Sequence, residues 1–226
     1  MKNKILVISA HPDDEILGCG GTVAKLVQKG YGVFTLILGE GITSRDDRRD
    51  RKKREKEIIE LQKQSKLANK ILGVKESFFS EFPDNRFDTV PLLDIVKVIE
   101  KIKNQIKPEI IFTHYKNDLN IDHRITYNAV ITATRPVVGE HVKEVYSFET
   151  LSSTEWNFPL GFSPNTFFDI SETIDVKLKA FKEYKAELRE YPHPRSLEGL
   201  KINAEYWGIK IGVKYAEVFR SVRIIR

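Results

Sequence analysis

Two short polar segments contain the residue types that metal-assisted hydrolysis needs. Segment 11–14 reads His-Pro-Asp-Asp, so a histidine and a carboxylate three residues apart can aim at one point, with a second carboxylate beside them. Segment 117–123 ends in a further histidine, His123, preceded by Asp122. A catalytic zinc ion takes about three protein ligands and keeps one position for a water molecule whose pKa falls to near 7. The spacing therefore predicts a mononuclear zinc site made of His11, one of the two neighbouring aspartates and His123, in which the other aspartate serves proton transfer.

A metal-bound imidazole usually donates its second nitrogen to a nearby acceptor, and Asp122 or another acceptor is expected to hold His123 in this way. Each segment also has a simpler interpretation. Asp13 or Asp14 could cap the helix that begins near Ile16, and Asp122-His123 could be a surface pair. Taken together, the two segments favour the metal site.

The elements that must position these segments follow from the hydrophobic pattern. Continuous apolar and β-branched runs are typical of strands buried in a parallel sheet, whereas apolar residues at steps of three and four indicate helices. On this basis strands are expected at 4–9, 31–38, 109–113, 145–148 and 216–219, and helices at 16–28, from about 48 to 73, at 91–106 and at 176–190. Such an alternation implies a Rossmann-like α/β fold, a three-layer α/β/α sandwich with a mostly parallel sheet.

Both polar segments follow predicted strands, and such sheets bind ligands beyond the carboxyl ends of their strands. The strand before His123 is expected to lie beside the first strand, which would bring the two segments together. The chain of 226 residues fits one ordinary domain, so residues 1–226 are expected to form a single domain.

The composition of the chain excludes several classes of protein. Hydrophobic residues make up 41% and charged residues 31%, as in globular proteins. No stretch approaches the roughly 20 apolar residues that span a bilayer, and the single cysteine, Cys19, excludes an intrachain disulfide. We therefore expect a cytoplasmic protein that is not integral to a membrane. The sequence leaves open whether the protein forms a homo-oligomer.

The charge of the chain gives little indication of a partner. The 37 basic and 32 acidic residues leave a net charge of +5 that is spread along the sequence, so nucleic-acid binding is not expected. The dense basic run at 48–54 is interleaved with acidic residues and is typical of a solvated helix face. Among the basic residues, Arg45 is the one we expect to contact an anionic substrate group.

The residues around the first segment resemble a known family. Ala10 to Glu15 reads Ala-His-Pro-Asp-Asp-Glu and continues as Ile-Leu-Gly-Cys-Gly-Gly-Thr at 16–22. This motif resembles that of the PIG-L or LmbE-like zinc-dependent N-deacetylases, which include de-N-acetylases of N-acetylglucosamine conjugates. The similarity extends to Gly-Glu-Gly at 39–41, segment 117–123 and Tyr-Ala-Glu-Val-Phe at 215–219, and so covers most of the chain.

The resemblance implies separate roles for the two aspartates. His11, Asp14 and His123 would bind zinc, and Asp13 would be the general base. Arg45 matches an arginine that contacts substrate in the family.

The second segment departs from the family pattern. Many members carry His-Pro-Asp-His there, whereas this chain has Asn120 in place of the first histidine. An amide can stabilise an oxyanion but cannot supply a proton at neutral pH. His114 or His193 could fill that role near the substrate, or Asp13 could move the proton both ways.

The sequence therefore predicts a zinc-dependent hydrolase that removes the N-acetyl group from an N-acetylglucosamine-type substrate, free or linked to a nucleotide or lipid. Two alternatives remain open. A Mg²⁺-dependent phosphoesterase could use Asp13, Asp14 and Asp122, since hard cations prefer oxygen ligands, although the two histidines speak against it. A non-catalytic sugar- or nucleotide-binding module would use the acidic segment only as a helix cap.

Overall fold

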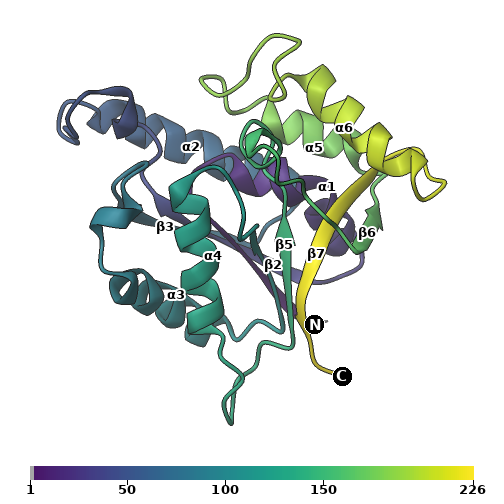
Figure 1. The fold of residues 1–226 in the computed structure, drawn as a ribbon, viewed down its shortest axis with the longest axis horizontal. Coiled ribbons are helices and arrows are strands. Elements are labelled where there is room, and N and C mark those ends of the chain that lie inside the picture. The colour runs from purple at the N-terminus through teal and green to yellow at the C-terminus, as the bar shows by residue number, and fades with distance from the viewer. Residues whose placement is uncertain (1–2) are drawn as a thin grey trace.

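Within residues 3–226, which a computed structural model describes, seven strands form one sheet in the order β3-β2-β1-β4-β5-β7-β6 (Figure 1). The strands are β1 (Lys4–Ser9), β2 (Gly32–Gly39), β3 (Glu76–Phe82), β4 (Ile110–His114), β5 (Glu144–Phe148), β6 (Thr166–Asp169) and β7 (Ala216–Ile224). Strands β1 to β5 pair in parallel, and β7 runs antiparallel to both of its neighbours, β5 and β6. The sheet is therefore mostly parallel, as the alternation of elements predicted.

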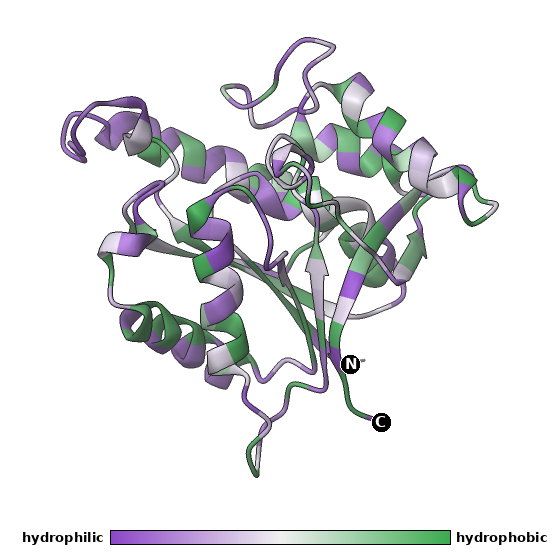
Figure 2. Ribbon diagram, viewed as in Figure 1, coloured by the Kyte–Doolittle hydropathy of each residue, from purple (hydrophilic) through white to green (hydrophobic). Residues whose placement is uncertain are grey.

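Helices cover both faces of this sheet. They are α1 (Asp14–Gln28), α2 (Glu55–Leu72), α3 (Leu92–Ile106), α4 (Ile121–Ala133), α5 (Ile174–Phe181) and α6 (Leu197–Ile209). Apolar side chains of α1, α2 and α5 form one core with the sheet, and those of α3 and α4 form a second core on its other face. Figure 2 shows hydrophobic residues gathered along the central strands between these helices. The predicted three-layer α/β/α fold is confirmed.

The strand order places the two polar segments at one point. β1 has β2 on one side and β4 on the other, so the chain changes direction across the sheet between them. Crevices at such a switch point, beyond the carboxyl ends of the strands, are where α/β sheets bind ligands. The loop after β1 carries His11, and the loop after β4 leads into the first turn of α4, which carries His123.

Several elements differ from the sequence-based prediction. Strand β3, helix α4, strand β6 and helix α6 were not predicted. Helix α4 buries Asp122, His123 and Thr126 together with apolar residues, so it lacks the apolar stripe that marks a helix in the sequence. Helix α2 begins at Glu55 and not near residue 48, and α5 ends at Phe181, well before residue 190. In the part of the chain described here, no helix combines the length and hydrophobicity that crossing a membrane requires.

Candidate metal centre

The loop between β1 and α1 holds its first histidine and second aspartate close together. Asp13 has a φ of 107°, a conformation that residues other than glycine seldom adopt. The backbone N–H of His11 donates to Asp14 Oδ2 at 2.8 Å. Gly41, with a φ of 75°, packs against this loop so closely that a Cβ atom there would lie 2.7 Å from Cδ of Pro12. The loop conformation is thus fixed by its own hydrogen bond and by the segment that follows β2.

Glu15 anchors the loop at Asp13, the residue with the positive φ. One of its carboxylate oxygens accepts from the Asp13 N–H at 3.1 Å, and the other accepts from Asn69 Nδ2 at 2.8 Å and from the Tyr184 hydroxyl. Burial raises the pKa of Glu15 to about 7, although its hydrogen bonds with Tyr184 and Asn69 oppose the shift. The final glutamate of the motif therefore ties the loop to α2 and to the segment after α5.

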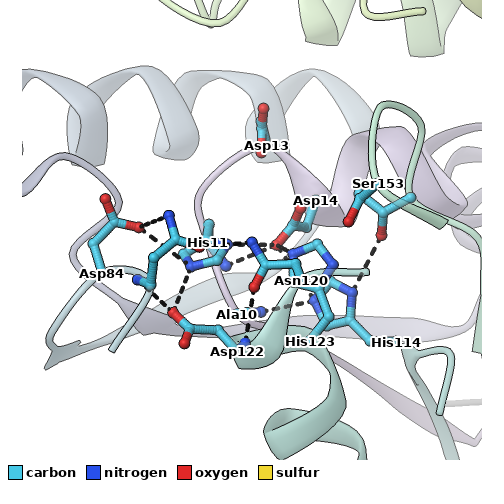
Figure 3. A network of polar contacts seen from close by, with 12 residues as sticks. Ala10, His11, Asp13, Asp14, Asp84, His114, Asn120, Asp122, His123 and Ser153 are labelled. Carbon is cyan, nitrogen blue, oxygen red and sulfur yellow. Dashed lines mark hydrogen bonds and ion pairs between the residues drawn. The ribbon is translucent and has the colours of Figure 1, made fainter. Parts of the chain in front are cut away.

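His11, Asp14 and His123 converge on one point (Figure 3). Nδ1 of His11 lies 3.5 Å, and Nε2 of His123 3.3 Å, from Asp14 Oδ2. The three residues offer ligand atoms that all lie within 4.8 Å of one another. Nε2 of His123 is buried and has no hydrogen-bond partner. Two imidazole nitrogens and one carboxylate oxygen are a donor set that zinc accepts, so these residues fit a zinc ion.

A carboxylate stands behind each of the two imidazoles. Nε2 of His11 lies 2.9 Å from Asp122 Oδ2, and Nδ1 of His123 lies 3.0 Å from Asp118 Oδ1. Asp122 is fully buried and also accepts from the backbone N–H groups of Asn85 at 2.7 Å and Phe87 at 2.9 Å. Such carboxylates fix the orientation of metal-binding histidines. Asp122 therefore serves His11, and the carboxylate that lies against Nδ1 of His123 is Asp118.

His11, Asp84 and Asp122 form a second group of donors, on the other side of the same imidazole. Nε2 of His11 lies 3.3 Å from Asp84 Oδ1. Here, however, both oxygens of Asp122 already accept backbone N–H groups, and Asp84 Oδ2 accepts from the N–H of Ser44 at 3.0 Å. Backbone N–H groups thus hold both oxygens of Asp122, whereas within residues 3–226 the Asp14 carboxylate accepts a backbone N–H at Oδ2 alone, so the first group is the better fit for a metal.

The electrostatics of the site favour positive charge at two of its three imidazoles. Burial alone would lower the pKa of His11, but Asp122 and Asp14 raise it well above 6.5. Against the same effect of burial, Asp14 and Asp118 raise the pKa of His123 to about 9. Burial and the neighbouring charge of His123 instead lower the pKa of His114 to about 4. Asp14 has a pKa well below its usual range because His123 and His114 outweigh its burial.

A cavity of about 230 Å³ opens above these residues. Most of its lining is polar, and it includes His11, Pro12, Asp13, Asp14, Leu17, Gly41, Ser44, Arg45, Asp84, Asn85, Asn120, His123, Thr150, Leu151, Ser152, Ser153, Glu187, Arg189 and Arg195. Asp13 lies in this wall, apart from the cluster of imidazoles in Figure 3. Its carboxylate is 3.1 Å from the Arg195 guanidinium. Burial raises the pKa of Asp13, and Arg195 opposes that shift.

Two further predicted residues lie at the cavity. Arg45, in a 3-10 turn at Thr43–Arg45, bonds to Glu187. Asn120 caps α4 by accepting from the Asp122 N–H at 2.8 Å, and its Nδ2 donates to Asn85 Oδ1 at 2.7 Å. The structure thus brings both side chains to the wall beside the three candidate ligands.

The structure does not bring the other two predicted histidines to the cavity wall. His114 is fully buried, its Nε2 accepts from the Ala10 N–H at 2.9 Å, and its Nδ1 lies 3.2 Å from Thr150 Oγ1. Its ring stacks on that of His123 with centroids 3.9 Å apart, so it supports the site from beneath. His193 lies outside the cavity lining, against the edge of the Trp156 ring.

Sequence reasoning missed Asp118, Asp84, Glu187 and Arg195. Asp118 lies in the singled-out segment 117–123, and its pKa falls to about 2, because His123 and the hydroxyls of Ser153 and Thr154 outweigh its burial. Arg195 lies two residues after His193, in the same loop, and no spacing signal distinguishes it. No spacing signal marked Asp84 or Glu187.

Comparison with known proteins gives a family for this arrangement. The family model GlcNAc-PI de-N-acetylase (PIG-L) matches residues 6–134, which include most of β1, all of β4 and all three candidate ligands. An uncharacterized deacetylase of Escherichia coli, YaiS, is 32% identical over 188 residues, which cover 80% of this chain and 90% of that protein. The diacetylchitobiose deacetylase of Thermococcus kodakarensis is 28% identical over 228 residues, 97% of this chain and 83% of that protein.

A solved structure agrees with these sequence matches. The N,N'-diacetylchitobiose deacetylase of Pyrococcus horikoshii, determined with an inhibitor, has a TM-score of 0.77 to this chain at 24% identity. The similarity covers 98% of this chain and 84% of that one. At this identity the match supports the fold.

Proposed function

Because this chain belongs to the PIG-L family of de-N-acetylases, we propose that it is a zinc-dependent hydrolase that removes the acetyl group from an N-acetylglucosamine-type amino sugar. One observation carries the proposal. Two imidazoles, each backed by a buried carboxylate, turn their other nitrogens toward Asp14 at the floor of a polar cavity. The diacetylchitobiose deacetylase among the relatives supports the choice of an amino sugar as substrate.

His11, Asp14 and His123 would hold the metal. A zinc ion there would polarise the acetamide carbonyl and lower the pKa of a water molecule toward neutrality. Asp122 and Asp118 each lie against one nitrogen of an imidazole, and the other nitrogen of that ring would be directed to the metal position.

Asp13 is the proposed general base. It lies beside Asp14 at the cavity wall, and its Oδ2 is bonded to Arg195. Oδ1 is therefore the oxygen available to take a proton from the attacking water. General-base catalysis of this kind contributes about 10²- to 10⁴-fold.

The leaving amine needs a proton, and the cavity offers few groups to supply it. His114 is buried and its Nε2 accepts from Ala10, and Asn120 carries no proton to give at neutral pH. We therefore assign proton return to Asp13, which would take the proton from water and deliver it to the nitrogen. Asn120 Nδ2 has a second hydrogen that can be donated to the developing oxyanion.

The walls of the cavity suit a sugar. Ser44, Ser152, Ser153 and Arg45 line it. The Ser44 and Ser153 hydroxyls donate to Asp84 and Asp118, so their oxygens can accept from sugar hydroxyls, and the Arg45 guanidinium can donate to sugar hydroxyls or to an anionic group attached to them. Because most of its lining is polar, the cavity suits a polar substrate better than an apolar one.

The test is amine release by the zinc-loaded protein from diacetylchitobiose, N-acetylglucosamine and N-acetylglucosamine conjugates, with acetate measured in parallel. We expect equal amounts of amine and acetate from at least one substrate, and loss of at least about 10²-fold in Asp13→Asn while zinc is retained. Lys185→Gln, a change at an exposed residue two positions before Glu187, should keep wild-type activity. No amine from any acetylated amino sugar would contradict the proposal, and phosphate release from an aryl phosphate with Mg²⁺ would instead support a phosphoesterase.

A further inference from the structure

Arg195 forms an ion pair with Asp13. Its NH1 group lies 3.1 Å from Asp13 Oδ2 and 3.2 Å from Glu187 Oε2. Among residues 3–226, Arg195 is the one residue whose side chain is hydrogen bonded to the Asp13 carboxylate. Only 26% of the Arg195 side chain is exposed, so this ion pair is largely protected from solvent screening.

Hydrogen bonds hold the backbone on both sides of Arg195, whose side chain lines the cavity. The Arg195 N–H donates to His193 Nδ1 at 3.1 Å, and its carbonyl accepts from the Arg189 N–H at 3.3 Å. The next residue, Ser196, caps α6 by accepting from the Gly199 N–H at 2.9 Å. The loop that contains His193 thus serves to hold Arg195.

Glu187 fixes the guanidinium from the other side. Its side chain is 10% exposed and bonds to Arg195 through Oε2 and to Arg45 through Oε1. A carboxylate held between two guanidinium groups limits the rotation of both. Glu187 and Asp13 both accept from the same NH1 group, so the position of Arg195 in the structure satisfies both carboxylates at once.

We propose that Arg195 is a positioning residue for the reaction, which holds Asp13 by Oδ2 so that Oδ1 faces the attacking water, and that Glu187 locks Arg195 in place. The inference rests on the proposed function, in which Asp13 is the base. A misplacement of about 1 Å in a catalytic group can cost 10²-fold in rate, so the loss of Arg195 should lower kcat about 10- to 100-fold.

A direct contact of Arg195 with substrate is the competing role. Its Nε is buried without a hydrogen-bond partner, and Arg195 lines the cavity. The two roles differ in their dependence on Asp13. A residue that acts through Asp13 loses its effect when the carboxylate is removed, whereas a substrate contact keeps its effect and raises KM.

The test is a double-mutant cycle of Arg195→Gln and Asp13→Asn on the zinc-loaded protein, with kcat, KM, zinc content and melting temperature measured for each variant. Arg195→Gln should lower kcat about 10- to 100-fold with KM within about 2-fold and zinc retained, and should cost no more than about 2-fold in the Asp13→Asn background. Arg195→Lys should recover part of the loss, Glu187→Gln should show a smaller loss, and Lys185→Gln should show none.

The outcomes separate this inference from the proposed function. A full loss from Arg195→Gln in the Asp13→Asn background, or an effect confined to KM, would overturn the positioning role alone. Wild-type activity in Asp13→Asn would overturn the assignment of the base and the positioning role with it. Crystal structures supply a readout that needs no turnover: in Arg195→Gln the Asp13 carboxylate should leave its position while the zinc ligands stay, and an unmoved carboxylate would refute the inference.

Discussion

Replacing Asp122 with asparagine should weaken zinc binding without removing a ligand. Asp122 receives three hydrogen bonds, from His11 Nε2 at 2.9 Å and from the backbone N–H groups of Asn85 and Phe87. An asparagine has one oxygen in place of two, so one of these donors would face an amide N–H. The Phe87 N–H bonds to Oδ1, whereas His11 and the Asn85 N–H share Oδ2. The amide therefore keeps most contacts with its oxygen at the Oδ2 position, and His11 then faces a neutral acceptor in place of a charged one.

The size of the effect follows from the same contacts. A hydrogen bond to a charged group contributes about 1.5–3 kcal/mol and a neutral one about 0.5–1.5 kcal/mol, so neutralising Asp122 costs about 1–1.5 kcal/mol at His11. Since each 1.4 kcal/mol is tenfold in affinity, the Kd for zinc should rise about 5- to 12-fold.

The assay is competition for zinc with a chromogenic chelator at fixed pH. Asp88→Asn, a nearby exposed aspartate, is the matched control and should leave the Kd unchanged. Circular dichroism would establish that Asp122→Asn is folded. A folded Asp122→Asn protein with wild-type zinc affinity would refute the claim that Asp122 orients His11.

Two further predictions concern stability. Glu217 is buried, accepts from the N–H groups of Gly21 and Thr22, and pairs with Lys177 at 2.6 Å. Glu217→Gln should therefore lower the free energy of unfolding, measured by urea denaturation, by about 3 kcal/mol. A loss as small as that caused by Glu198→Gln, at an exposed residue, would contradict this prediction. Burial raises the pKa of Glu149 above 4.5, so above that pH the folded protein keeps a proton that the unfolded chain releases. The free energy of unfolding of the wild type, relative to that of Glu149→Gln, should therefore fall as pH rises from 4.5 toward neutrality. Urea denaturation over that range checks the sign, and a difference that rises with pH would contradict it.

The layout of the fold and the two histidines of the candidate site could be predicted because both depend on local signals, whereas the choice of Asp14 over Asp13 rested on the family resemblance. Strand β1 is a continuous apolar run that ends directly at the His-Pro-Asp-Asp segment, and the apolar run of β4 leads toward His123. The pairing of β1 with β4 then brings the two histidines together. Helix α4 escaped prediction because its first turn buries polar residues, which removed the usual periodicity.

The partners of the ligands could not be assigned from local sequence. Asp118 and Asp122 are four residues apart in one segment, and only the direction of the first turn of α4 decides that Asp122 reaches His11 while Asp118 reaches His123. Arg195 meets Asp13 across 182 residues of sequence, through a loop whose path depends on packing in the folded chain. Pattern alone carries no information on such contacts.

The most direct test of the account is the metal content of the purified protein, measured by inductively coupled plasma mass spectrometry after dialysis with limiting chelator. The arrangement of His11, Asp14 and His123 predicts about one zinc ion per wild-type chain, and its loss in both His11→Ala and His123→Ala with the fold retained. Wild-type protein without zinc, or a full complement of zinc in folded His123→Ala, would contradict the central claim.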